Sequence, residues 1–199
     1  MPATPIEPLV DIELLKTRLL IGEDGLVDTD NLKQALFSSE QLISSLLRTD
    51  LRKIEATEVF YVVRSDLVLD GTQVQLQTRN GFIGEIEITQ TQRLHAQNGK
   101  TVSTYLADTE KGILTIPFDD QQGYFTVTYK SGFEPTDELP EWLTNLILLG
   151  TEVVYNMPSN GKEDRGTSSS REQIDAIVAE HSRLANRAVK GISYAVNQP

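Results

Sequence analysis

The two histidines are the first residues of this 199-residue chain that could do chemistry, because paired histidines can bind zinc. His95 and His181 lie far apart in the sequence, however, and the chain has no cysteine to complete a zinc-binding pattern. We therefore interpret both histidines as ordinary surface or core residues and expect no metal site. The lack of cysteine also excludes disulfides and thiol nucleophiles, and it fits a reducing compartment.

Asp119 and Asp120 form a pair of carboxylates that could act as general acid and general base. They lie in the stretch FDDQQG, which is typical of a turn in which aspartate bonds to the local backbone. No nucleophile motif of the G-x-S-x-G kind accompanies them. A hydrolase that uses these two residues stays an alternative, and our interpretation is that the chain is not an enzyme.

Two further stretches match ion-binding loops only in part. Gly99–Thr101 reads GKT, like the end of a phosphate-binding loop, but Leu94 stands where that loop needs a glycine. A calcium loop that started at Asp28 would need a glycine where Lys33 stands. We interpret the acidic residues around Asp28 as helix caps, and we expect no cofactor.

The chain is strongly acidic, with a net charge of -11 from 18 basic and 29 acidic residues. The imbalance is uneven, because residues 162–199 hold six of the basic and only five of the acidic side chains. Duplex DNA binds basic surfaces, so this composition argues against DNA phosphate as the main partner. No apolar run is long enough to span a bilayer and the first residues lack the pattern of a signal peptide, so we expect no membrane association.

The periodicity of the apolar residues changes once along the first two thirds of the chain. Residues 1–56 are expected to hold an irregular arm and a helical hairpin, whose longer helix carries Leu32, Leu36, Leu42, Ile43, Leu46 and Leu47 at helical spacing. Residues 57–131 then alternate in short β-branched and aromatic runs, separated by Asp-Gly and Asn-Gly turns. This second pattern predicts an antiparallel β-unit.

Residues 132–158 are expected to form the central helix of the protein. Pro140 suits the first helical turn, and an apolar run that includes Trp142, Leu146 and Ile147 covers more than half of the helix surface. A helix of this kind is buried on several sides, so these four residues are the ones on which we expect the fold to depend.

The last two segments differ from the body of the chain. Residues 159–170 are polar and rich in Gly and Ser, which predicts a flexible linker, and residues 171–199 read as a C-terminal helix, ending near Val189, and a tail. The expected fold class is therefore α+β. The N-terminal hairpin, the central apolar helix and the C-terminal helix would form a helical bundle with an inserted antiparallel β-unit.

One combination of motifs is specific enough to suggest a family. A strand that holds Val127–Tyr129 and Gly132 leads into a helix through Leu139–Glu141, and that helix stays apolar as far as Tyr155. Residues 11–44 add a short helix, an acidic loop and a long second helix. In these features the chain resembles the head–tail connector proteins of tailed bacteriophages, also called adaptor or head-completion proteins.

The resemblance implies a structural virion protein. Such a protein would form a ring of about a dozen copies at the capsid–tail junction, after assembly in the host cytoplasm. Its partners would be the portal protein, a tail or stopper protein, and further copies of itself. The ring would extend the DNA channel, and DNA would pass through it without sequence-specific binding.

The C-terminal segment, residues 171–199, is expected to be the portal-binding arm, because connectors of this family commonly fasten to the portal through this part. In the tail ISYAVNQP the apolar residues alternate, which suits a strand added to a partner's surface. The expected contacts are apolar anchors and basic residues that meet an acidic portal surface: Ile192, Tyr194, Val196, Arg183, Arg187 and Lys190. A frayed terminus is the alternative, and deletion of 191–199 is expected to leave the fold nearly unchanged.

A binding module is the second functional class that the sequence leaves open. A small-molecule or glycan-binding β-module with a helical base would use Trp142 and Tyr105 as stacking residues on an open face. The connector interpretation instead places Trp142 inside the helical core. Because the body of the chain is acidic, we also expect the free protein to be monomeric, or a mixture of states, in dilute solution.

Overall fold

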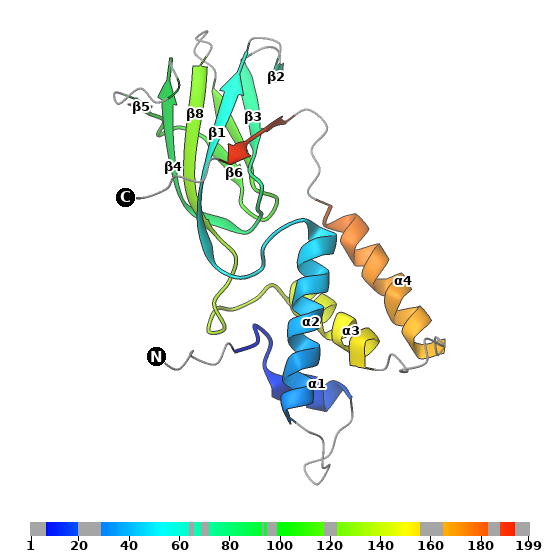
Figure 1. Ribbon diagram of the computed structural model, residues 1–199. Coiled ribbons are helices and arrows are strands. Elements are labelled where there is room, and N and C mark those ends of the chain that lie inside the picture. The colour runs from blue at the N-terminus through cyan, green and yellow to red at the C-terminus, as the bar shows by residue number, and fades with distance from the viewer. Residues whose placement is uncertain are drawn as a thin grey trace, which may run out of the picture. The chain divides into compact units, whose positions relative to one another are not determined.

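The computed structural model describes residues 7–19, 29–63, 66–68, 72–92, 94, 99–117, 123–155, 165–182 and 188–193. The chain divides into two compact units, each built from two separate parts of the sequence (Figure 1). Met1–Leu47 and Phe133–Ser182 form a helical unit, and Arg48–Gly132 and Arg183–Pro199 form a β-unit. The structure has four helices and two mainly antiparallel sheets among its described residues, which confirms the α+β class.

The helical unit contains α1 (Ile12–Arg18), α2 (Thr29–Leu47), α3 (Glu141–Tyr155) and α4 (Arg165–Glu180). The side chain of Asp11 caps α1 by accepting a hydrogen bond from the backbone N–H of Glu13 at 3.0 Å. α3 lies between its neighbours and packs against both α2 and α4. The core of the unit is built mainly from aliphatic side chains: Leu15, Leu32, Leu36, Ile43, Leu143, Leu146, Ile147, Leu149, Val153 and Ile174.

Pro140 marks the point at which α3 begins. Pro140 precedes the helix, and its carbonyl accepts the first two helical hydrogen bonds, from the N–H groups of Leu143 at 2.9 Å and Thr144 at 3.0 Å. Leu146 and Ile147 are fully buried, whereas Trp142 is half-buried. None of the described helices is both long enough and apolar enough to pass through a bilayer.

Among the described residues the β-unit contains ten strands. They are β1 (Ile54–Val62), β2 (Leu67–Val68), β3 (Gln73–Gln77), β4 (Ile83–Thr91), β5 (Lys100–Thr101), β6 (Leu106–Asp108), β7 (Ile113–Pro117), β8 (Gly123–Ser131), β9 (Val189–Lys190) and β10 (Ile192–Ser193). The first sheet has the order β10-β1-β8-β4-β5, and the second has the order β2-β3-β7-β6, with β9 also paired to β3.

Two crossing segments join the sheets at opposite edges. Residues 100–108 pass from β5 in the first sheet to β6 in the second, and residues 189–193 pass from β9 on β3 to β10 on β1. The two sheets are therefore connected twice, once through residues 100–108 and once through residues 189–193. The enclosed core consists of Phe60, Val62, Val74, Leu76, Ile83, Ile88, Leu114, Ile116, Phe125, Val127 and Tyr129.

Candidate assembly site

The described part of the C-terminal tail belongs to the β-unit. β9 pairs in parallel with β3, where Val189 lies opposite Leu76, and the side-chain amine of Lys190 donates a hydrogen bond to the Gln77 side chain. β10 pairs antiparallel with β1, with Ile192 opposite Val59. The described part of the tail thus adds two short strands to sheets of its own chain.

Gly191 is the residue at which the tail changes sheets. A Cβ atom at this position would lie 2.2 Å from Oε2 of Glu58 and 2.8 Å from Cζ of Phe60. Both distances are far shorter than a normal contact, so only glycine lets the backbone pass this close to β1. Deletion of 191–199 would remove this crossing and β10, so it would disturb the β-unit rather than leave the fold unchanged.

Glu58, the residue beneath this crossing, is a buried carboxyl group that the sequence analysis did not single out. One of its oxygens accepts a hydrogen bond from the backbone N–H of Arg79 at 2.8 Å, and the Tyr129 hydroxyl donates to the same carboxyl group. Burial, reinforced by the neighbouring Glu58, raises the pKa of Tyr129 well above its usual range. The motif tyrosine of β8 therefore has a structural role, as donor to a buried acid.

Most residues of the predicted portal-binding set lie outside the described residues. Arg183, Arg187, Tyr194 and Val196 fall there, and only the backbone of Ile192 is described. Lys190 is exposed on β9. The expected last helix, from about Ser170 to Val189, begins earlier, at Arg165, and ends earlier, at Glu180.

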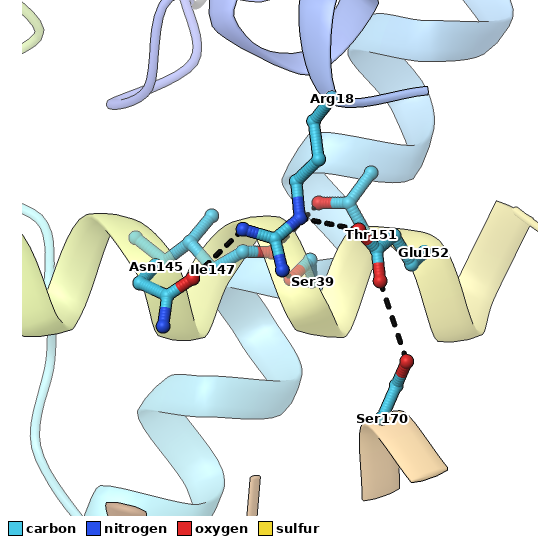
Figure 2. Close-up of polar contacts among 7 residues, drawn as sticks. All are labelled: Arg18, Ser39, Asn145, Ile147, Thr151, Glu152 and Ser170. Carbon is cyan, nitrogen blue, oxygen red and sulfur yellow. Dashed lines mark hydrogen bonds and ion pairs between the residues drawn. The ribbon is translucent and has the colours of Figure 1, made fainter. Parts of the chain in front are cut away.

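α4 packs along α3 in the antiparallel direction and is not detached. At one end the rings of Trp142 and His181 are stacked, with centroids 3.7 Å apart and an angle of 10° between their planes. At the other end the Ser170 hydroxyl donates to Oε2 of Glu152 at 3.3 Å (Figure 2). Since the start of one helix meets the end of the other in both contacts, the two helices form a defined antiparallel pair.

A polar network connects α1 and α4 to α3 (Figure 2). The guanidinium group of Arg18, at the end of α1, donates to Oε1 of Glu152 and, at 2.7 Å, to Oδ1 of Asn145. Glu152 also accepts the bond from Ser170, so one carboxylate on α3 receives side chains from both neighbours. Charge-assisted bonds of this kind orient the short α1 on the bundle.

α2 and α3 approach each other closely at a small residue on each helix. The buried Ser39 hydroxyl donates to the Ile147 carbonyl at 2.6 Å, and Thr151 donates to the same carbonyl at 2.8 Å. A Cβ atom on Gly150 would lie 2.4 Å from Oγ of Ser39. The absence of a side chain at Gly150 therefore allows the two helices to pack at this distance.

The structure describes only some of the residues considered for chemistry. Within Gly99–Thr101, Lys100 and Thr101 form the edge strand β5, whereas a phosphate-binding loop would lead into a helix. Among the described residues no three His, Asp or Glu side chains gather in a way that could hold a metal ion. His95, Asp28, Asp119 and Asp120 lie outside the described residues.

One apolar surface lies on the long helix at residues for which the sequence pattern predicted no function. Leu42 and Leu46 recur at helical spacing with the buried apolar residues of the long helix, but their own side chains are 37% and 39% exposed. A signal for this was present in the sequence, because the second half of that helix has leucines on two faces and almost no charge. Trp142 and Tyr105, the proposed stacking residues, belong to different units, and each contacts other residues of its own unit.

The fold of this chain is similar to that of chains in known structures. No protein-family model matches the sequence, and no curated protein is detectably similar to it. Among solved structures, a chain in the neck of an empty gene transfer agent (GTA) particle, computed with C6 symmetry, is 11% identical with a TM-score of 0.55, over 89% of this chain and 91% of that one. A chain in the virion of a native GTA particle is 12% identical with a TM-score of 0.56, over 92% and 94%. At this identity the likeness concerns the fold.

Proposed function

We propose that this protein is a structural component of the neck of a phage-like particle, where copies form a ring between the portal and the tail. The observation that carries the proposal is the likeness in fold to chains of the GTA neck and virion, which extends over about nine tenths of both partners. A match over nearly the whole length includes the helical unit and the β-unit together. It therefore concerns both units and not a common local motif.

The connector motifs support the same function because they fall on defined parts of the fold. Val127–Tyr129 lies in β8, the central strand of the first sheet, and Leu139–Glu141 leads into α3, the central helix of the helical unit. Each motif thus occupies the element around which its unit is built. The resemblance in sequence and the likeness in fold are separate observations, and they support one function.

The net charge of -11 agrees with a channel through which DNA passes without being held. An acidic wall repels the phosphate backbone, so DNA would move past the ring without strong contacts. The same ring would complete the head after packaging and offer the tail or stopper protein a surface to bind.

Within this function, residues 171–199 are proposed to supply the portal contacts. Arg183, Arg187 and Lys190 would meet acidic side chains of the portal, and Ile192, Tyr194 and Val196 would supply apolar contacts. Since β9 and β10 belong to the β-unit, the binding element would be presented on a folded sheet edge rather than on a free tail. This arrangement lowers the conformational entropy that binding would otherwise cost.

Electron microscopy of the protein mixed with its cognate portal tests the function, and two variants test the arm. Truncation after Ser193 removes Tyr194 and Val196 while it keeps β9 and β10, and Arg187→Glu reverses one predicted contact. Lys33→Glu, at an exposed position on α2, is the charge-matched control. We expect wild type and control to form rings on portals and both arm variants to lose them. Portals that stay bare with wild type would contradict the function; full occupancy with both arm variants would place the arm elsewhere.

A further inference from the structure

The outer face of α2 carries no charged residue in its second half. The exposed residues after Gln34 are Ser38, Gln41, Leu42, Ser45 and Leu46, which recur at helical spacing and so share one side of the helix. We call them the α2 outer face. Between Gln34 and Leu47 the single charged residue is Glu40, and it is buried, where one of its oxygens accepts a hydrogen bond from the Leu9 N–H at 2.6 Å.

This composition is unusual for a helix surface in contact with water. Charged residues make up 24% of the chain, and the exposed side of a surface helix is where they normally concentrate. The cores of protein–protein interfaces are instead depleted of charge and enriched in apolar area. Leu42 and Leu46 lie one turn apart, so their exposed parts form a continuous apolar strip along the helix.

One hydroxyl group of the α2 outer face already has a hydrogen-bond acceptor within the helix. The Ser38 hydroxyl donates a hydrogen bond at 2.9 Å to the carbonyl of Gln34, one turn earlier in the same helix. A partner that covered Ser38 would therefore not leave this hydroxyl without an acceptor. The usual cost of burying a polar group is largely avoided at this position.

The charge of the chain indicates what covers the face. Two copies with a net charge of -11 repel each other overall, and a contact between two acidic surfaces would place like charges side by side in a region without water. An uncharged face is where such copies can meet at neutral pH without that penalty. A strongly basic partner would instead gain most from the acidic surfaces.

We infer that the α2 outer face is the contact surface for a second copy of this chain. The inference rests on the proposed ring, and it assigns a surface to the contact between neighbours. In a closed ring the contact is head-to-tail, so the α2 outer face of one copy meets a different surface of the next.

The test uses a double variant, Leu42→Lys with Leu46→Lys, and a matched control, Leu14→Lys. Leu14 is also exposed, at 51%, but it lies on α1 outside the face. Lysine makes the net charge less negative, so a loss of association in the double variant could not arise from stronger overall repulsion. Circular dichroism and thermal melting establish that each variant is folded before association is compared.

Association is measured by analytical ultracentrifugation of the free protein at high salt and by ring occupancy on portals. The double variant is expected to associate at least about tenfold more weakly, a loss of about 1.4 kcal/mol, while the control associates like wild type. Rings that persist in the double variant would overturn the inference and leave the proposed function intact. Equal loss in the control would also overturn it, because the effect would not belong to the face.

A labelling experiment separates failure of the face from failure of the function. Because the chain has no cysteine, Ser45→Cys carries a single thiol on the face, and Thr136→Cys carries one at an exposed turn elsewhere in the helical unit. Assembly is expected to slow thiol modification at 45 by at least about tenfold and to leave 136 unchanged. Protection at 45 in soluble assemblies that never bind portals would uphold the face and contradict the neck function. An equally reactive thiol at 45 in complete rings would overturn the face alone.

Discussion

At the scale of single residues, the two units depend on small residues and buried polar groups at close contacts. Gly150 lets α2 and α3 pack with Ser39 between them, and Gly191 lets the tail cross over Glu58. In both places the glycine faces an oxygen that is itself part of a contact. The substitutions that test these contacts can therefore be paired with changes in the facing residue.

Gly150→Ala is expected to destabilise the protein although alanine is the better helix former. Alanine would stabilise an ordinary helix position by about 1 kcal/mol, whereas here its Cβ would displace the Ser39 hydroxyl, and overpacking costs about 1–3 kcal/mol. In the Ser39→Ala background the oxygen is gone, so the same change should cost much less. Denaturant unfolding of the four proteins in this cycle measures the coupling; strict additivity of the two changes would contradict the close contact.

Tyr129 is expected to make the β-unit less stable at alkaline pH. Burial raises its pKa in the folded state, whereas a tyrosine in the unfolded chain ionises at about pH 10. The contribution of the protonated Tyr129 side chain to the free energy of unfolding is therefore complete below about pH 10. It is lost above that pH, because the unfolded state releases the proton more easily than the folded state. The free energy of unfolding should then fall by up to about 1.4 kcal/mol per pH unit.

Denaturant titrations at several alkaline pH values check this dependence. Tyr129→Phe should show a shallower fall of the unfolding free energy with pH, while Tyr61→Phe, which changes an exposed ring, should match wild type. At neutral pH Tyr129→Phe should cost about 1–3 kcal/mol, since Glu58 loses a donor in a buried site. An unchanged alkaline slope in Tyr129→Phe would show that another group titrates.

At the scale of elements, the antiparallel pair of α3 and α4 is held at both of its ends. The stacked rings of Trp142 and His181 join the start of α3 to the end of α4, and Ser170 and Glu152 join the opposite ends. α4 has only a thin apolar stripe, in which Ile174 is buried. The contacts at its two ends therefore help to determine how α4 is positioned on α3.

His181→Ala is expected to loosen the end of α4 and to uncover Trp142. A stacked ring pair contributes about 0.5–1.5 kcal/mol beyond the area it buries, and the imidazole covers one face of the indole. Trp142 is the single tryptophan of the chain, so acrylamide quenching of its fluorescence reports on this contact directly. Quenching should rise in His181→Ala and not in Gln173→Ala, an exposed position on the same helix. Equal quenching in wild type and His181→Ala would be inconsistent with the stack.

At the scale of the whole molecule, net charge controls when copies can meet. A charge of -11 on a 22.2 kDa chain produces repulsion that acts over about 10 Å at 0.1 M salt and that salt shortens. The free protein should therefore stay monomeric at low concentration and low ionic strength, and the portal would supply the template on which copies are brought together.

Raising the salt concentration is expected to strengthen self-association. Between about 0.05 M and about 0.5 M salt the screening length falls roughly threefold, so repulsion decreases while apolar contacts such as those of Leu42 and Leu46 persist. Light scattering across this range should show the weight-average mass rise with salt. A mass that falls as salt is added would mean that ion pairs, and not apolar surfaces, hold the copies together.

The sequence by itself determined the elements whose patterns repeat over many residues. The apolar run that starts after Pro140 predicted the central helix, and the alternation in residues 123–131 predicted a strand with one buried face. These patterns arise from the 3.6-residue and two-residue periods of the backbone, which act locally. The α+β class followed from them.

The tertiary structure alone decided how short and distant segments combine. β9 and β10 have two residues each, too few to show a period, and they exist because β3 and β1 offer free edges about 110 to 135 residues earlier in the chain. The burial of Glu58 and the exposure of Leu42 and Leu46 have the same origin. A local pattern shows that a helix has two apolar faces, but only long-range packing determines which of them the rest of the chain covers.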